Sequence, residues 1–107
     1  MAAALLMTAS HAAARDTDAE SGVFAVTGVA VDETAEDAAA ARAAALRNAR
    51  KTAFEMLSER LVPDPARRKA VLDDADEQTI STLIESFEIN EEAVSDVRYI
   101  ATLTFYF

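Results

Sequence analysis

Residues 34–61 read TAEDAAAARAAALRNARKTAFEMLSERL, an alanine-rich stretch that contains neither Gly nor Pro. Ala has the highest intrinsic helix propensity, so this composition predicts one long helix. Thr34 and Asp37 have the spacing of a capping box, and acidic side chains in a first turn stabilise a helix because they face unpaired backbone N–H groups. We therefore expect a helix from about Thr34 to Leu61, around which the rest of the chain is arranged.

One face of this helix is expected to be buried, with small side chains in its first half and larger ones in its second. The expected stripe consists of Ala39, Ala43, Leu46, Ala49, Ala53, Leu57 and Leu61, with Phe54 and Met56 at its margins. Small side chains allow a helix to lie close to a flat surface, so a β-sheet is the expected partner. Arg42, Arg50 and Arg60 lie at the edges of the stripe, where their long side chains would cover apolar surface; contact with an anion is the alternative.

Three segments are expected to form strands. Residues 23–31, VFAVTGVAV, are rich in β-branched residues, and Gly28 within them predicts a bulge or a close approach of the helix. A second strand is expected over about Glu85 to Glu91. The alternation of Val97 to Phe107 predicts a third strand that is apolar on both faces, so we place it between the other two.

Two short helices are expected between the long helix and the second strand. Pro63 stops the long helix, while Asp64 and Pro65 suit the N-cap and first position of a new one. Asp76 would cap a further helix over residues 77–84. The acidic run at 73–77 lacks the glycine of an EF-hand calcium loop, so we interpret this run as a solvent-exposed loop. The predicted fold is α+β: a two-layer sandwich whose three-stranded antiparallel or mixed sheet carries one long and two short helices on one face.

This arrangement leaves the other face of the sheet open. The last strand would present there a set of partly apolar residues, which we take as the candidate interaction surface: Ile100, Thr102, Thr104 and Tyr106.

The length, charge and residue types of the chain limit the functions that it can have. The 107 residues suffice for one domain, expected over residues 22–107, with a continuation past Phe107 as the alternative. The formal net charge of −9 argues against nucleic acid and anionic lipid as partners. His11 is the only histidine and there is no Cys, so the chain lacks the parts of Ser-His, Cys-His and zinc sites. We expect no catalytic residues, no cofactor and no metal.

The N-terminal residues 1–14, MAAALLMTASHAAA, are uncharged and mostly small or apolar, as at the end of a secretory signal peptide. Ala12 to Ala14 form a candidate cleavage site, and the true start would lie upstream because a basic region is missing. Residues 15–21 are expected to be a flexible lead-in. The sequence therefore predicts a periplasmic or otherwise exported protein without a transmembrane segment.

The segments VFAVTGVAVD, ARAAALRNARKTAFEMLSERLVP, SFEINEE and VRYIATLTFYF, with Arg60 and Leu61 closing the long helix, resemble a bacterial domain-of-unknown-function family, the one numbered two thousand and sixty-six. The resemblance covers residues 22–107. It implies an envelope protein with no assigned activity, of which this chain would be a truncated member.

The preferred interpretation is a non-enzymatic periplasmic interaction or assembly module, whose partner is another envelope protein or a second copy. One alternative is a fragment of a carboxylate-dependent enzyme, which would need clustered buried carboxylates. The other is a small-molecule or lipid binder, which would need a cavity between helix and sheet near Phe54, Met56 and Leu57.

Overall fold

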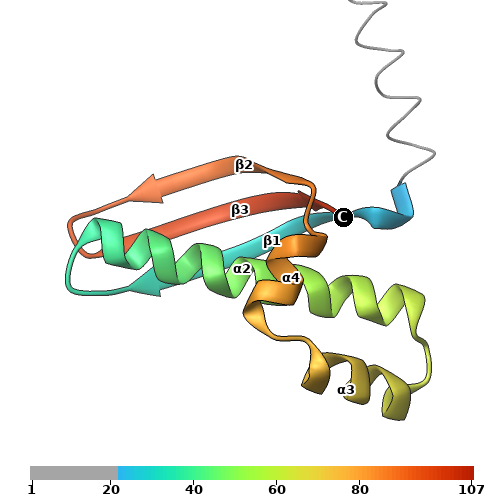
Figure 1. Cartoon of the computed structure of the whole chain (residues 1–107). Coiled ribbons are helices and arrows are strands. Elements are labelled where there is room, and N and C mark those ends of the chain that lie inside the picture. The colour runs from blue at the N-terminus through green and yellow to red at the C-terminus, as the bar shows by residue number, and fades with distance from the viewer. Residues whose placement is uncertain (1–21) are drawn as a thin grey trace, which may run out of the picture.

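A computed structural model describes residues 22–107 as an α+β arrangement with helices packed against a three-stranded antiparallel sheet (Figure 1). The fold class expected from the sequence is confirmed. In chain order the elements are a short 3-10 helix η1 (Gly22–Phe24), β1 (Ala25–Thr34), α2 (Ala38–Leu61), α3 (Pro65–Asp74), α4 (Glu77–Leu83), β2 (Ser86–Val94) and β3 (Arg98–Tyr106).

The strand order in the sheet is β1-β3-β2, and both neighbouring pairs are antiparallel. The final strand is therefore central, as its two partly apolar faces predicted. β2 is three residues longer at its C-terminal end than the predicted strand, and it forms one edge of the sheet, while β1 forms the other. Among the described residues each edge strand has β3 as its one partner.

Gly28 forms the predicted bulge in β1. Its φ of +70° is a conformation that favours glycine, and the pairing register with β3 shifts between Val26 and Val29. The shift keeps Val26 and Val29 on the same face of the sheet, where both are fully buried. One extra residue in β1 thus allows two valines three positions apart to face the core together.

The long helix begins later than the sequence predicted. Thr34 is the last residue of β1, and Asp37 is the N-cap, with its side chain accepting a hydrogen bond from the backbone N–H of Ala40 at 2.7 Å. The capping-box interpretation of Thr34 and Asp37 was therefore wrong, because pairing of Thr34 with Arg98 extends the strand. Asp64 and Asp76 cap α3 and α4 as expected.

The buried face of α2 also differs from the prediction. Ala41, Ala45, Ala49 and Ala53 are fully buried against the sheet, whereas Ala39 and Ala43 are exposed and Leu61 is 47% exposed. The physical reason is that Ala occupies nearly every position from 38 to 45, so this part of the helix has no periodicity from which a face can be chosen. The later residues Ala49, Ala53 and Leu57 were assigned correctly.

The core lies between α2 and the strands β1 and β3. β3 contributes Tyr99, Ala101, Leu103 and Phe105 to it. α2 does not cover β2, so the nine residues of this strand are exposed or half-buried. Figure 1 shows β2 at the edge of the sheet, away from the long helix.

Candidate functional site

The outer face of the sheet, away from α2, carries the predicted interaction surface. Ile100 is 38% exposed, Thr102 and Tyr106 are half-buried and Thr104 is buried. The Thr104 hydroxyl donates to Asn90 Oδ1 at 2.8 Å, and the Tyr106 hydroxyl donates to Glu88 Oε1. Two of the four side chains thus already have partners on β2, and the role of this surface in binding stays a prediction.

Arg98 and Asp32 form a two-pronged ion pair on the same face. Arg98 Nε donates to Asp32 Oδ1 at 2.8 Å, and Arg98 Nη2 donates to Asp32 Oδ2 at 2.6 Å. The hydrogen bond from Arg98 holds the pKa of the Asp32 carboxyl below its usual value. The outer face is therefore mainly polar, with Ile100 as its exposed large hydrophobic residue.

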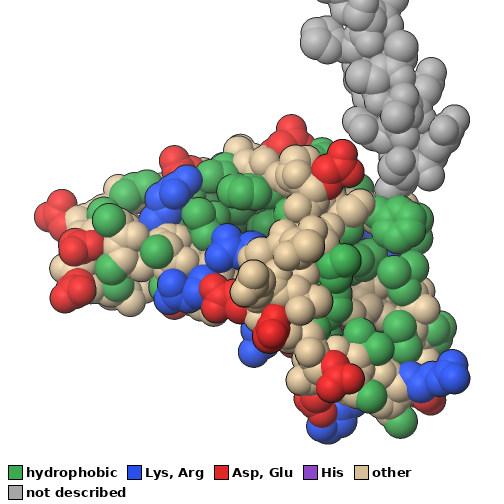
Figure 2. Space-filling model, in the orientation of Figure 1, with side chains coloured by type: hydrophobic (Ala, Val, Ile, Leu, Met, Phe, Trp, Pro, Cys, Tyr) green, Lys and Arg blue, Asp and Glu red, His purple; other side chains and the backbone are tan. Residues whose placement is uncertain are grey.

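A second surface lies on the helix side of the sheet, along β2. Phe87, Ile89 and Val94 pair with the buried residues Phe105, Leu103 and Tyr99, so they belong to the core-facing side. However, Phe87 is 40% exposed, Val94 is 56% exposed and Ile89 is half-buried. We call these three residues the β2 shelf, and Figure 2 shows hydrophobic side chains gathered between β2 and α2.

The strand that bears this shelf is strongly acidic. Glu88, Glu91 and Glu92 lie within Ser86–Val94, which contains no Lys or Arg. As an edge strand, β2 also has backbone N–H and C=O groups that β3 does not pair. Glu92 pairs with the buried Ala101 and so lies on the shelf side, whereas Glu88 and Glu91 pair with Thr104 and Thr102 on the outer face. The shelf thus has one carboxylate on its own face and two on the opposite face of the same strand.

Tyr99 connects this acidic strand to the core. Its ring is fully buried, its hydroxyl donates to a carboxylate oxygen of Glu92, and the guanidinium of Arg42 lies over the ring at 6.0 Å from its centroid. Burial, followed by the hydrogen bond and the charge of Glu92, raises the pKa of the Tyr99 hydroxyl. Arg42 therefore has a specific partner as well as a covering role.

Arg60 has a structural task that the sequence does not reveal. Its Nη1 donates to the backbone carbonyls of Ala25 at 2.7 Å and Val23 at 3.0 Å, with Gly22 further away at 3.4 Å. These bonds join the end of α2 to the start of β1. No sequence signal could have found them, because the acceptors are backbone atoms.

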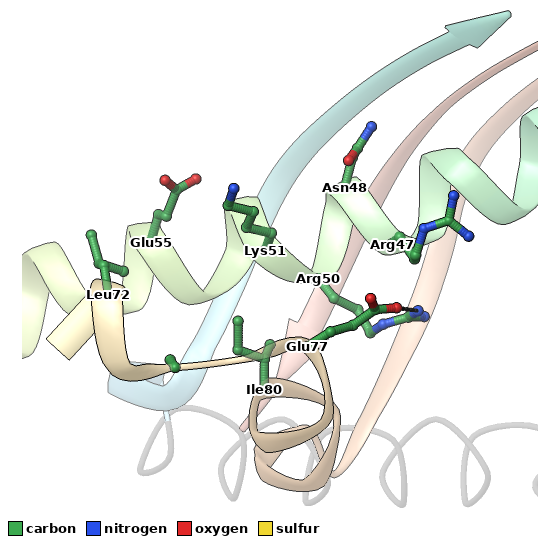
Figure 3. Close-up of a pocket in the computed structure, with 9 residues that line it drawn as sticks. Arg47, Asn48, Arg50, Lys51, Glu55, Leu72, Glu77 and Ile80 are labelled. Carbon is green, nitrogen blue, oxygen red and sulfur yellow. Dashed lines mark ion pairs between the residues drawn. The ribbon is translucent and has the colours of Figure 1, made fainter.

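A pocket of about 320 Å³ lies between α2 and the α3–α4 segment (Figure 3). Its lining residues are Arg47, Asn48, Arg50, Lys51, Glu55, Leu72, Ala75, Glu77 and Ile80. Arg50 Nη2 lies 3.9 Å from Glu77 Oε1, beyond hydrogen-bonding distance, and the buried Arg50 Nε has no partner among the described residues. Leaving such a group unsatisfied costs about 1–3 kcal/mol.

The pocket is not the one expected for a small-molecule or lipid binder. Phe54 and Leu57 are buried in the core, and neither they nor Met56 line this pocket. Sequence reasoning named Arg50 but missed Arg47 and Lys51, which lie on α2 within the adjoining turns. Three basic residues within five positions were the available signal.

The carboxylates of residues 22–107 all lie at exposed or half-buried positions. No group of three or more side chains there is placed to hold a metal ion. Within the same residues, no helix combines the length and the hydrophobicity that a membrane span requires.

Comparisons of the chain with family models, curated proteins and solved structures gave no match. The resemblance to the domain-of-unknown-function family therefore stays a prediction. The signal-peptide-like segment 1–14 and the lead-in 15–21 lie outside the described residues.

Proposed function

We propose that the chain is a non-enzymatic interaction module of the bacterial cell envelope, which binds an amphipathic helix of another protein on the β2 shelf. The observation that carries this proposal is the exposure of Phe87 and Val94 on the core-facing side of the sheet, beside α2.

The dimensions of helices and sheets support this occupant. A helix is about 10 Å across with its side chains, and neighbouring strands are about 4.8 Å apart, so one helix covers about two strands. α2 packs on β1 and β3, which leaves the third strand uncovered. A helix lying on β2 alongside α2 would bury Phe87, Ile89 and Val94 and complete the helical layer.

The charge of β2 indicates which kind of helix would bind to the shelf. Glu92 lies on the same face as the shelf, whereas Glu88 and Glu91 lie on the opposite face of the same edge strand. A helix whose apolar stripe is flanked by Lys or Arg would therefore be attracted mainly by Glu92. All three carboxylates would repel their counterparts if two copies of the chain met edge to edge through β2. The partner is therefore a different, basic segment and not a second copy of this acidic chain.

The cellular setting rests on the N-terminal segment. If residues 1–14 are the end of a signal peptide, the partner is an exported or membrane-anchored protein that faces the periplasm. Export is tested separately, by fusing the N-terminal region to a reporter enzyme that is active only outside the cytoplasm.

Two designed helical peptides test the binding proposal. They share one Leu-rich stripe and differ only in having Lys or Glu at the flanking positions. We expect the Lys peptide alone to shift the NMR signals of Phe87, Ile89 and Val94, and Val94→Glu to abolish the effect. Val71→Glu provides a matched control, because Val71 is an exposed residue of α3.

Three results would count against the proposal. Equal binding of both peptides would remove the electrostatic argument. Shifts centred on Ile100 would move the binding surface to the outer face of the sheet. Loss of binding in Val71→Glu would mean that the substitutions act through general destabilisation.

A further inference from the structure

The pocket between α2 and the α3–α4 segment concentrates positive charge in an acidic protein. Its lining contains Arg47, Arg50 and Lys51 together with two carboxylates, Glu55 and Glu77, so the lining has a net charge of +1 while the chain has −9. Figure 3 shows the side chains coming from α2 on one side and from the α3–α4 segment on the other. Such a local excess attracts anions against the field of the whole molecule.

The basic side chains of the pocket are also short of partners. Elsewhere in the described part of the chain, Arg98, Lys69, Arg60 and Arg68 bond to carboxylates or backbone carbonyls, whereas the exposed Arg67 side chain does not. Arg47 and Lys51 make no hydrogen bond or ion pair within residues 22–107. Arg50 has the loose 3.9 Å contact to Glu77 and a buried Nε without an acceptor.

Apart from Asn48, the rest of the lining is apolar. Leu72, Ala75 and Ile80 come from the α3–α4 segment, and Ile80 is buried. A volume of about 320 Å³ lies at the small end of the range for ligand sites. The pocket therefore combines donors for an anionic head group with a short apolar surface.

We infer that this pocket binds a small organic anion, whose carboxylate or phosphate head group pairs with Arg47, Arg50 and Lys51 and whose short apolar body lies on Leu72 and Ile80. The anion supplies the acceptor that Arg50 Nε lacks, and it competes with Glu77 for the Arg50 guanidinium. Planar, forked donors of this kind suit both carboxylates and phosphates. This site is separate from the β2 shelf and does not depend on the proposed helix partner.

The test is an NMR titration of the isotope-labelled chain with three probes: inorganic phosphate, hexanoate and hexyl phosphate. We expect saturable shifts of the Arg47, Arg50 and Ile80 signals, with dissociation constants on the order of millimolar or tighter. Tighter binding of hexyl phosphate than of inorganic phosphate would show that the apolar body contributes. Hexanoate against hexyl phosphate distinguishes the two head groups.

Variants that should weaken anion binding and one that should strengthen it complete the test. Arg47→Gln combined with Lys51→Gln should weaken binding by about tenfold or more, since two charge-assisted contacts are lost. Glu77→Gln should tighten binding, because it removes the competing carboxylate. Arg67→Gln and Glu36→Gln change the same charges at exposed positions outside the pocket and should leave the affinity unchanged.

Circular dichroism and the dispersion of the amide spectrum show whether each variant is folded. Shifts that spread over all surface cations, equal effects of Arg67→Gln and the pocket variants, or no saturation by any probe would overturn the inference. Failure of the Lys peptide to bind the β2 shelf would not affect it.

Discussion

Phe87 stacks on Phe105 with ring centroids 5.5 Å apart and an interplanar angle of 24°. Phe105 is fully buried, whereas Phe87 is 40% exposed, so the β2 shelf is a direct continuation of the hydrophobic core. Phe87→Ala should lower the free energy of unfolding by about 1–2 kcal/mol, through lost apolar burial and lost ring stacking. Urea denaturation measures this cost. Val94→Ala, a change at the more exposed end of the shelf, should cost less, and an equal loss would contradict the stacking argument.

The close contact of α2 with the sheet predicts that added bulk is harmful on one face of the helix only. Ala49→Leu should destabilise the fold by about 1–3 kcal/mol, because Ala49 is fully buried and the extra methylenes have no space. Ala43→Leu, on the exposed side, should leave the free energy of unfolding nearly unchanged. Thermal denaturation of the two variants measures both effects. An equal loss at Ala43 would favour the face expected from the sequence, which included both alanines.

The positive φ of Gly28 predicts that a side chain added there destabilises the fold through backbone strain and not through a steric clash. A Cβ atom added at Gly28 would meet no atom within 4 Å, but an L-residue at φ +70° is strained. Gly28→Ala should therefore cost about 1 kcal/mol and Gly28→Val more, since β-branching adds to the strain. Gly22→Ala is the control, because Gly22 has equal space and no such dihedral angle. Similar stability losses at both glycines would argue against the bulge as described.

The bonds from Arg60 to the start of β1 predict local fraying when they are removed. Arg60→Gln should speed hydrogen exchange of the amides near Ala25 and lower the unfolding free energy by about 1 kcal/mol, the usual worth of such bonds at an exposed site. Arg67→Gln removes an exposed guanidinium that makes no hydrogen bond or ion pair within residues 22–107, so its exchange rates should match those of the parent chain. Unchanged exchange in Arg60→Gln would show that η1 and β1 are held by other contacts.

The raised pKa of Tyr99 predicts a loss of stability in alkaline solution. The folded state retains the phenol proton above the ordinary pKa of 10.0, so Tyr99 contributes fully below about pH 10 and its contribution falls as the pH rises through the higher folded value. In Tyr99→Phe the fall of unfolding free energy above pH 10 should be shallower. Denaturation curves across the alkaline range give both slopes, and identical slopes would mean that Tyr99 does not titrate differently in the two states.

The parts of the fold that the sequence predicted are those with a local signal. Asp64 and Pro65 mark a helix start, Gly28 marks a bulge, and the alternation of residues 97–107 marks a strand fit for the centre of the sheet. The rotation of α2 could not be predicted, because Ala on every side of the helix gives no preferred face.

The functional surfaces were harder to predict than the fold. The shelf of Phe87, Ile89 and Val94 is uncovered only because α2 is one helix wide, which is a property of the packing and not of β2 itself. The outer-face residues around Ile100 were visible as an alternating pattern, but the partners of Thr104 and Tyr106 were not. The pocket required two segments distant in sequence, α2 and α3–α4, to come together.

The place of β3 between β1 and β2 has a consequence for the order of events in folding. β1 and β2 are both synthesised before the strand that joins them, so no backbone ladder can form until Arg98 to Tyr106 have left the ribosome. Until then α2 can be helical, but the sheet against which it packs has not formed. Pairing thus waits for β3, and the long separation of β1 from β3 in the sequence makes folding slower than that of a helical bundle of similar size.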